Sequence, residues 1–398
     1  MAVALLYCGD GDGTILLDNV SEGGEGVYIE ELRLRNYRNY TDEQLTLNQG
    51  VNIFVGENGQ GKTNLLESIY YLATGGNFRG NKDLELIRWE APYFRLQARL
   101  KKETSSRYFD LEIYADKERN KQLKINGVKY KRMAELLGYL QVVLFSPEDL
   151  KIIKGGPAER RRYIDQEICQ LDGRYYTLIH QYQKVLQQRN NLLKAVAYHR
   201  AKDSELAVWD EQLVRYGAPI IYQRLQFLKI LVPLARRMQK ELTDQGEVFN
   251  VTYHSSLGPV GALEQAEIGG IFERMLSGGR SEELRRGVTL WGPHRDDLIF
   301  YLNGYELKTY GSQGQQRTGI LALKLAELET FYRHNQEYPL LLLDDVMSEL
   351  DDKRRRYLLR IIQDNHIQTI ITGANMELIT NEMAQDEVFV IKEGKIIR

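Results

Sequence analysis

The chain has 398 residues, of which 43% are hydrophobic and 27% charged, and its formal net charge is −2. These values are typical of a globular protein with two or three folded regions, and no apolar run is long enough to span a bilayer. The two cysteines, Cys8 and Cys169, lack the spacing of a metal site or a disulfide framework, as we expect of a cytoplasmic protein. Because the net charge is near zero, any binding of nucleic acid must come from local basic patches.

Residues 1–27 differ from the rest of the chain, because glycine is unusually frequent in them. We predict a disordered extension with one short strand near residues 15–17. The organised fold is expected to begin at Tyr28.

Between residues 28 and 150 the pattern predicts mainly strands. Stretches of alternating apolar and polar residues lie from Leu32 onward, over residues 94–100 and over residues 109–113. Asn126 and Gly127 are a signal for a hairpin turn. We therefore expect an antiparallel subdomain inserted after the first helix.

The apolar residues 51–55 predict a buried strand, and the loop after them fits the pattern G-x-x-x-x-G-K-[ST]. The loop consists of Gly56, Glu57, Asn58, Gly59, Gln60, Gly61, Lys62 and Thr63. Backbone N–H groups of such a loop and the start of the following helix, predicted over residues 64–72, converge on phosphates. Lys62 then reaches the β- and γ-phosphates, where it also assists catalysis, and the Thr63 hydroxyl binds Mg²⁺. We predict ATP and Mg²⁺ as cofactors; the alternative is a chance glycine-rich turn.

A helical lobe follows the short buried strand predicted over residues 142–145. Residues 157 to about 250 contain few glycines and many Leu, Gln, Arg and Tyr at helical spacing. We place the lobe at residues 151–285, which is too short for a long coiled coil.

The C-terminal part, residues 286–398, returns to alternating strands and helices. Strands are predicted over residues 288–290, 298–302, 340–343 and 369–372, helices over residues 315–334 and within residues 349–364, and turns at Asn303-Gly304 and Glu393-Gly394. Strands alternating with helices in this way indicate an α/β fold.

Two carboxylates, Asp344 and Asp345, end the apolar strand 340–343. Adjacent carboxylates repel each other, and a Mg²⁺ ion resolves that conflict. We assign Asp344 to the metal, largely through water, and Asp345 to polarising the attacking water. The alternative is a solvated strand end, which the phosphate loop elsewhere in the chain makes less favoured.

A second polar motif, Ser312-Gln313-Gly314-Gln315, precedes the helix predicted over residues 315–334. It can be a polar turn with an N-capping serine. Because the motif lies before the acidic strand with a helix between them, it resembles the Leu-Ser-Gly-Gly-Gln signature of ABC ATPases. Gly311 stands in place of the leucine, and Gln313 in place of the first glycine. Residues 348–351 resemble the D-loop. The resemblance implies that Ser312 to Gln315 bind the nucleotide of a second protomer.

The distance along the chain between the two motifs discriminates among these ATPases. About 250 residues separate Gly56 from Ser312, more than in transporter subunits and fewer than in SMC proteins, and a compact helical lobe fills the gap. Further strings resemble the RecF family, and the resemblance extends over about residues 28–398. The strings are YIEELRLRNYRNY (28–40), GENGQGKTN (56–64), FSPEDLKIIKGG (145–156), WGPHRDD (291–297), SQGQQR (312–317) and LLLDDVMSELD (341–351).

This resemblance implies a P-loop ABC-type ATPase head, lobe I, with a mixed sheet and an antiparallel subdomain, and a helical lobe II. RecF proteins are weak, DNA-dependent ATPases that form homodimers with ATP and clamp double-stranded DNA near single-strand gaps. With RecO and RecR they help to load RecA in gap repair, replication restart and the SOS response. No membrane partner is implied.

Three positions depart from the wider ABC pattern. Ser146 replaces the glutamine that senses the γ-phosphate, Gly373 replaces the switch histidine, and Asp345 replaces a glutamate. A shorter base lies farther from the water, so we predict slow hydrolysis and a switch set by ATP occupancy.

Several basic clusters are candidates for DNA contact, although each can equally be a solvated face. They are Arg160, Arg161 and Arg162; Lys129, Lys131 and Arg132; residues 353–356; and Arg285 with Arg286. Arg38 is expected to contact the nucleotide instead, since SMC-like proteins place a basic residue there.

Two questions stay open. RecF proteins usually begin at a methionine where this chain has Val27, so residues 1–26 can reflect a GTG start codon assigned too far upstream, or a real tail. The function can also be that of an ABC-transporter subunit, or of an ATP-gated scaffold without essential hydrolysis. The long helical insertion argues against the transporter, and an Asp345→Asn variant would separate the scaffold from the clamp.

Overall fold

The computed structural model describes residues 27–79, 83–102, 107–243, 246–373 and 387–397. The extension predicted before Val27, its short strand and the start-codon hypothesis lie outside the described residues.

A six-stranded sheet in the order β15-β14-β3-β13-β12-β8 forms the centre of the nucleotide-binding half. Its strands are β3 (Val51–Val55), β8 (Val142–Phe145), β12 (Leu340–Asp344), β13 (Thr369–Gly373), β14 (Glu387–Lys392) and β15 (Lys395–Ile397). Neighbouring strands from β14 to β8 pair in parallel, and β15 pairs antiparallel with β14. β3, β8, β12 and β13 are buried along their whole length, which explains why the sequence shows them as uninterrupted apolar runs.

A second sheet, in the order β2-β1-β4-β5-β6-β7, is entirely antiparallel. Its strands are β1 (Val27–Tyr37), β2 (Tyr40–Thr46), β4 (Tyr93–Lys102), β5 (Arg107–Asp116), β6 (Lys121–Ile125) and β7 (Val128–Tyr130). The predicted hairpin is confirmed, because Asn126 and Gly127 have the positive φ values of 51° and 77° that a tight turn between β6 and β7 requires. β1 and β2 precede the first helix, so only part of this sheet is an insertion after it.

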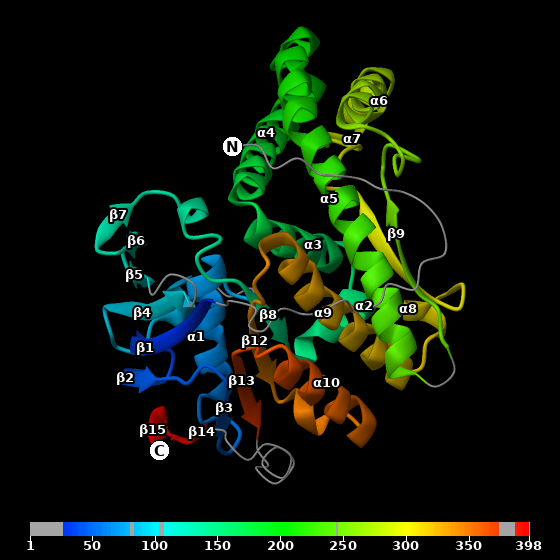
Figure 1. The fold of residues 1–398 in the computed structure, drawn as a ribbon. Coiled ribbons are helices and arrows are strands. Elements are labelled where there is room, and N and C mark those ends of the chain that lie inside the picture. The colour runs from blue at the N-terminus through cyan, green and yellow to red at the C-terminus, as the bar shows by residue number, and fades with distance from the viewer. Residues whose placement is uncertain (1–26, 80–82, 103–106, 244–245, 374–386, 398) are drawn as a thin grey trace.

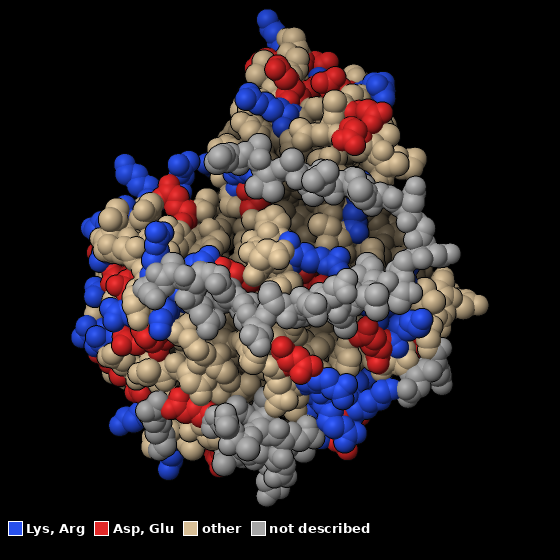
Figure 2. All heavy atoms as spheres, viewed as in Figure 1, with Lys and Arg blue, Asp and Glu red and all other residues tan. Residues whose placement is uncertain are grey.

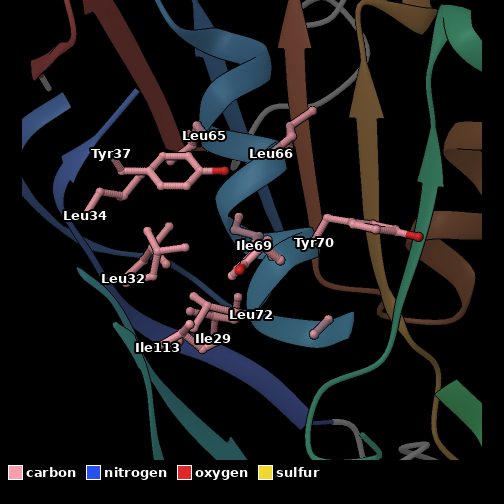
Figure 3. Close-up of a cluster of buried hydrophobic side chains, with 14 of the residues drawn as sticks. Ile29, Leu32, Leu34, Tyr37, Leu65, Leu66, Ile69, Tyr70, Leu72 and Ile113 are labelled. Carbon is pink, nitrogen blue, oxygen red and sulfur yellow. The ribbon is translucent and has the colours of Figure 1, made fainter. Parts of the chain in front are cut away.

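Helix α1 (Lys62–Thr74) lies between the two sheets. Figure 3 shows Ile29, Leu32 and Leu34 of β1 facing Leu65 and Ile69 of this helix. On the opposite face of the parallel sheet, α9 (Gln313–Asn335) and α10 (Asp352–Asp364) bury a second set of aliphatic side chains (Figure 1). The phosphate loop therefore connects a strand and a helix that are both fixed by apolar burial.

The remaining helices form the upper part of the view in Figure 1 and its junction with the sheets. They are α2 (Leu150–Lys154), α3 (Pro157–Leu171), α4 (Gly173–Ala197), α5 (Leu206–Leu242), α6 (Gln265–Gly278), α7 (Arg280–Arg286) and α8 (Leu307–Tyr310). Short 3-10 helices are η1 (Asp83–Leu86), η3 (Met133–Glu135), η4 (Pro147–Asp149), η5 (Asp203–Glu205) and η6 (Val346–Ser348). Predominantly helical structure over residues 157–242 agrees with the prediction.

A small sheet, β11-β10-β9, packs into the same core as these helices. Its strands are β9 (Phe249–His254), β10 (Asp297–Leu302) and β11 (Tyr305–Glu306), and Asn303-Gly304 makes the predicted turn. Leu298 and Phe300 thus share a core with α4 and α5, although they follow the predicted boundary at residue 285. The division into lobes stays a prediction.

The strand predicted over residues 288–290 was wrong. Thr289 donates its backbone N–H and its hydroxyl to the Asn190 side chain, at 2.7 Å each, and Leu290 donates its N–H to Glu283 at 2.9 Å. Because side chains satisfy this backbone, it needs no neighbouring strand.

Candidate nucleotide-binding site

The phosphate loop runs from the end of β3 to the start of α1, and two of its glycines are required by close approach. A Cβ on Gly56 would lie 2.4 Å from the carbonyl oxygen of Ile391 in β14. Gly61 has a φ of 120°, and a Cβ there would lie 2.6 Å from Nδ2 of Asn39. The spacing of glycines in the motif therefore reflects how tightly neighbouring chain packs around the loop.

Two residues that the sequence analysis missed hold the loop from outside. Asn39 donates from Nδ2 to the carbonyl of Gln60 at 2.7 Å and accepts from the Asn64 amide at 2.9 Å. The buried Tyr40 hydroxyl donates to the carbonyl of Gly61 at 2.9 Å. Both lie at the turn between β1 and β2, far from the motif in sequence, so a local pattern gave no signal for them.

Lys62 and Thr63 occupy the first turn of α1. The Lys62 ammonium group donates to the carbonyls of Gly56 and Glu57, at 2.6 and 2.9 Å, so it lies across the concave side of the loop. The Thr63 hydroxyl donates to Oδ1 of Asp344 at 2.9 Å. The structure thus brings together the loop and the strand end that the sequence places 281 residues apart.

The two adjacent carboxylates have different environments. Asp344 is buried, and its Oδ1 accepts from Thr372 as well as from Thr63, both at 2.9 Å. Burial raises the pKa of Asp344, and these two hydrogen bonds oppose the rise. Asp345 is half-buried, has a left-handed φ of 55°, and lies 3.5 Å from the Ser348 hydroxyl through its Oδ1. The backbone turn at Asp345 separates the two side chains, which the sequence alone could not show.

The oxygens of Thr63 and Asp344 form a donor set that fits Mg²⁺. A hydroxyl and a carboxylate are hard oxygen ligands, and Mg²⁺ commonly binds through one or two such protein groups together with phosphate oxygens and waters. Thr372, absent from the predicted ligand set, donates to the same carboxylate oxygen and helps to orient it. We treat Thr63 and Asp344 as a candidate pair of ligands.

The signature-like motif forms the N-terminus of α9. Ser312 caps this 23-residue helix, with its hydroxyl accepting from the Gln315 N–H at 3.2 Å and its own N–H donating to the Gln315 side chain at 3.0 Å. Gln315 also donates to Glu247 at 2.9 Å. Ser312 is therefore an N-cap, as the alternative predicted, and Ser312, Gln313 and Gly314 are nevertheless exposed.

The sheet order keeps this motif apart from the phosphate loop. The loop follows β3, while α9 returns the chain to β12, and β13 lies between β3 and β12. On the motif's side, Arg317 of α9 forms an ion pair with Glu349 at 3.7 Å, next to the D-loop-like segment that ends at the N-cap Asp351. Signature and D-loop are joined to each other, but within the described residues no hydrogen bond or ion pair that we observe joins Ser312–Gln315 to residues 56–63.

Arg38, predicted to contact the nucleotide, is bonded to α1. Its guanidinium group donates to both oxygens of the buried Glu67, at 2.7 and 2.9 Å, and to the carbonyl of Glu85 at 3.0 Å. These bonds attach the turn after β1 to the phosphate-loop helix. Contact with a nucleotide stays a prediction.

One member of the arginine triplet requires a correction, and DNA contact by Arg161 and Arg162, which are half-buried, stays a prediction. Arg160 is only 6% exposed and forms a bidentate ion pair with Asp297, at 2.7 and 2.8 Å, so it joins α3 to β10 and does not present a charge to DNA. Arg161 donates to the carbonyl of Asp296 at 2.8 Å, and Arg162 to that of Asn77 at 2.6 Å. Arg160 and Arg161 thus bind the adjacent residues Asp297 and Asp296, whereas Arg162 binds a different segment.

Other basic candidates are better exposed. Lys129, Lys131 and Arg132 lie exposed on β7 and the segment after it, at the end of the antiparallel sheet. Lys and Arg side chains also gather over α10 in Figure 2, where residues 353–356 begin the helix. Arg285 and Arg286 both pair with Glu282.

Comparisons with known proteins cover nearly all of the described chain. A family model described as "RecF/RecN/SMC N terminal domain" matches residues 28–397. The DNA replication and repair protein RecF of Alkaliphilus oremlandii (strain OhILAs) is 45% identical over 374 residues, which are 93% of this chain and 100% of that protein.

Two solved structures of the recombination mediator protein RecF in the RecFOR pathway, with ATPrS and with ATP, are also similar. Both have a TM-score of 0.87; they are 36% and 35% identical and cover 94% and 95% of this chain and 98% and 99% of theirs. Within the described residues, no helix is long and apolar enough to cross a membrane.

Proposed function

This chain belongs to the RecF family of DNA replication and repair proteins, and from that membership we propose that it is an ATP-set clamp on DNA. The family consists of ATP-binding, ABC/SMC-type ATPases. One observation carries the proposal beyond family membership. The phosphate loop and the signature-like motif are both well formed, yet they begin helices, α1 and α9, that pack on opposite faces of the same sheet. A nucleotide held by one therefore needs the other from a second copy of the chain.

Within this composite site, each residue has a proposed role. Residues 56–62 hold the phosphates, Thr63 and Asp344 bind Mg²⁺, and Asp345 positions the attacking water. Mg²⁺ supplies charge neutralisation at the β- and γ-phosphates when it is bound. Ser312 and the start of α9 face the γ-phosphate of the partner copy, where exposed N–H groups and the helix dipole favour negative charge.

We further propose that hydrolysis is slow and DNA-dependent. Asp345 is a short base on a turned backbone, and Ser146 replaces the glutamine of faster relatives. ATP occupancy then decides whether the dimer is closed, and turnover opens it.

The biological role follows from the family. We propose that the closed dimer binds double-stranded and gapped DNA in the cytoplasm through exposed basic residues such as Lys129 and Lys131. There it acts with RecR and RecO, and indirectly with RecA, in gap repair, replication restart and the SOS response. The transporter alternative is not favoured, because the relatives that match along the chain are DNA repair proteins.

The test is gel filtration with light scattering, with and without ATP and Mg²⁺, and with a gapped duplex. The wild-type chain is expected to become a dimer with ATP and to elute with the DNA. A Lys62→Ala variant loses charged hydrogen bonds to phosphate, so its ATP affinity should fall on the order of a hundredfold and it should stay a monomer.

Two outcomes would count against the proposal. A wild-type chain that binds ATP but has the same mass with and without it would refute the composite site. Copurification with a membrane protein in place of DNA would favour the hypothesis that the chain is an ABC-transporter subunit.

A further inference from the structure

Two exposed aromatic rings lie directly before the signature-like motif. Tyr305 at the start of β11 is 68% exposed, and Tyr310 at the end of α8 is 71% exposed. Their ring centroids lie 6.1 Å apart in an edge-to-face arrangement. Neither ring is needed for the core, and exposed aromatic groups of this kind are typical of interaction surfaces.

The turn that carries Tyr310 is fixed. Leu307 is buried, and its carbonyl accepts from Gly311 at 3.1 Å and from the Gln316 side chain at 3.0 Å. Lys308 donates to the carbonyl of Gly155 in the α2–α3 connection at 2.9 Å. The backbone around Tyr310 is thus held to α9 and to the α2–α3 connection, and the ring enters solvent from a rigid support. A rigid aromatic group loses little entropy when it is buried by a partner.

The position of Tyr310 relates it to the composite site. Two residues of extended chain span at most about 7 Å, so the Tyr310 backbone lies within that distance of Ser312. A surface that closes on Ser312 and the exposed start of α9 therefore comes within reach of the exposed ring. On the phosphate-loop side, the exposed rim consists of Glu57, Asn58 and Gly59, which is polar. An amphipathic tyrosine suits a contact that is apolar on its face and polar at its hydroxyl.

We propose that Tyr310 is a positioning residue of the composite site, packing against the nucleotide-loaded phosphate-loop rim of a second copy of this chain. The inference rests on the proposed dimer. By two-fold symmetry each closed dimer contains two such contacts. Tyr310 then makes closure sensitive to the nucleotide, because the rim it meets is complete only when ATP occupies the loop.

The first test measures dimerisation by analytical ultracentrifugation with ATP and Mg²⁺. Truncating one interface aromatic commonly weakens binding about tenfold or more, so Tyr310→Ala, which removes two rings per dimer, should weaken the dimer about a hundredfold. ATP affinity of the monomer should stay within about twofold of wild type, since no loop contact is lost. Tyr310→Phe keeps the ring and should dimerise like wild type.

Tyr198 provides a matched control. It is 73% exposed at the end of α4, where Arg200 lies 5.8 Å over its ring, and it is remote in sequence from the signature. Tyr198→Ala should leave dimerisation unchanged. If wild type dimerises with ATP and Tyr310→Ala dimerises equally well, the role of Tyr310 is refuted while the clamp proposal stands. If wild type itself does not dimerise, both fail.

The second test places the photo-crosslinker p-benzoylphenylalanine at position 310. Irradiation with ATP and Mg²⁺ should give a covalent dimer, with the crosslink mapped by mass spectrometry to the partner's residues 56–63 or to segments beside them. Omitting ATP, or placing the crosslinker at position 198, should abolish it. A crosslink from position 310 to added duplex DNA, or to a distant surface of the partner, would overturn the assignment.

Discussion

The two halves of this molecule use polar side chains in opposite ways. In the nucleotide-binding half, aliphatic side chains fill the layers around the parallel sheet, and polar groups such as Thr63 and Asp344 collect at the carboxyl ends of its strands. In the helical half, arginines enter the core itself. A charged residue at a strand end of the first half therefore indicates chemistry, whereas a charged residue on a helix of the second half commonly fixes the fold.

Arg189 illustrates the helical half. It is fully buried on α4 and donates to Asp210 of α5 at 2.7 Å, to Glu283 of α7 at 2.5 Å and to Thr289 at 2.8 Å. Arg224 of α5 similarly binds Asp165 of α3 and the carbonyl of Pro293, both at 2.8 Å. Arg189 thus joins four segments and Arg224 three, and a buried ion of this kind specifies how helices are arranged more than it adds stability.

The largest expected effect tests this contrast by removing Arg189. Arg189→Met keeps most of the volume but leaves Glu283 buried without its partner, so the free energy of unfolding should fall by about 3–5 kcal/mol. Urea denaturation followed by circular dichroism measures the loss. Arg285→Met, which breaks an exposed pair with Glu282, should leave the free energy of unfolding nearly unchanged. Equal losses in the two variants would remove the distinction between buried and exposed arginines.

A second, smaller effect concerns His294, which lies among the same groups. Burial, together with neighbouring Arg295, Arg161 and Arg189, lowers the pKa of His294 to about 4, although a hydrogen bond with the Thr289 carbonyl opposes this shift. Between about pH 6.5 and pH 4, His294 is therefore protonated in the unfolded chain and neutral in the folded chain. The stability from the neutral ring is present above about pH 6.5 and is lost as the pH falls toward 4.

His294→Gln should therefore reduce the pH dependence. Between pH 7.5 and pH 5 the wild-type chain should lose roughly 1–2 kcal/mol more than the variant, measured by urea denaturation at both values. If both proteins lose the same amount, His294 titrates normally and the helical half is more hydrated than its contacts indicate.

The smallest expected effect tests whether exposed lysines bind DNA and do not stabilise the fold. If Lys129 and Lys131 contact phosphates, Lys129→Ala/Lys131→Ala should reduce the slope of log affinity against log salt by about 0.9 per contact, without altering stability. DNA binding is measured by fluorescence anisotropy over a salt series. Arg285→Ala/Arg286→Ala removes the same charge elsewhere and serves as the control. If the control lowers the slope and the lysine variant does not, DNA contacts α7 and not β7.

How far the sequence predicts this molecule depends on the distance over which each contact acts. The hairpin at Asn126-Gly127 and the strand 51–55 with its loop depend on neighbouring residues, and the structure has them where local patterns place them. The strand over residues 288–290 failed because Asn190, about a hundred residues away, satisfies its backbone. The contacts of Asn39 and Tyr40 with the phosphate loop were likewise not predicted, because the two partners are brought together only by the fold.

The phosphate loop, the acidic strand end and the family could be predicted because they depend on residue types at fixed spacing. Which charged side chains are buried in the fold and which stay exposed became visible only in the folded chain. Arg160 looked like a contact for DNA, yet its partner Asp297 lies 137 residues away and buries it. The same packing left Ser312 exposed at the start of α9, which packs on the opposite face of the sheet from α1. Long side chains reach partners that no local pattern encodes, so their roles become visible only after the chain has folded.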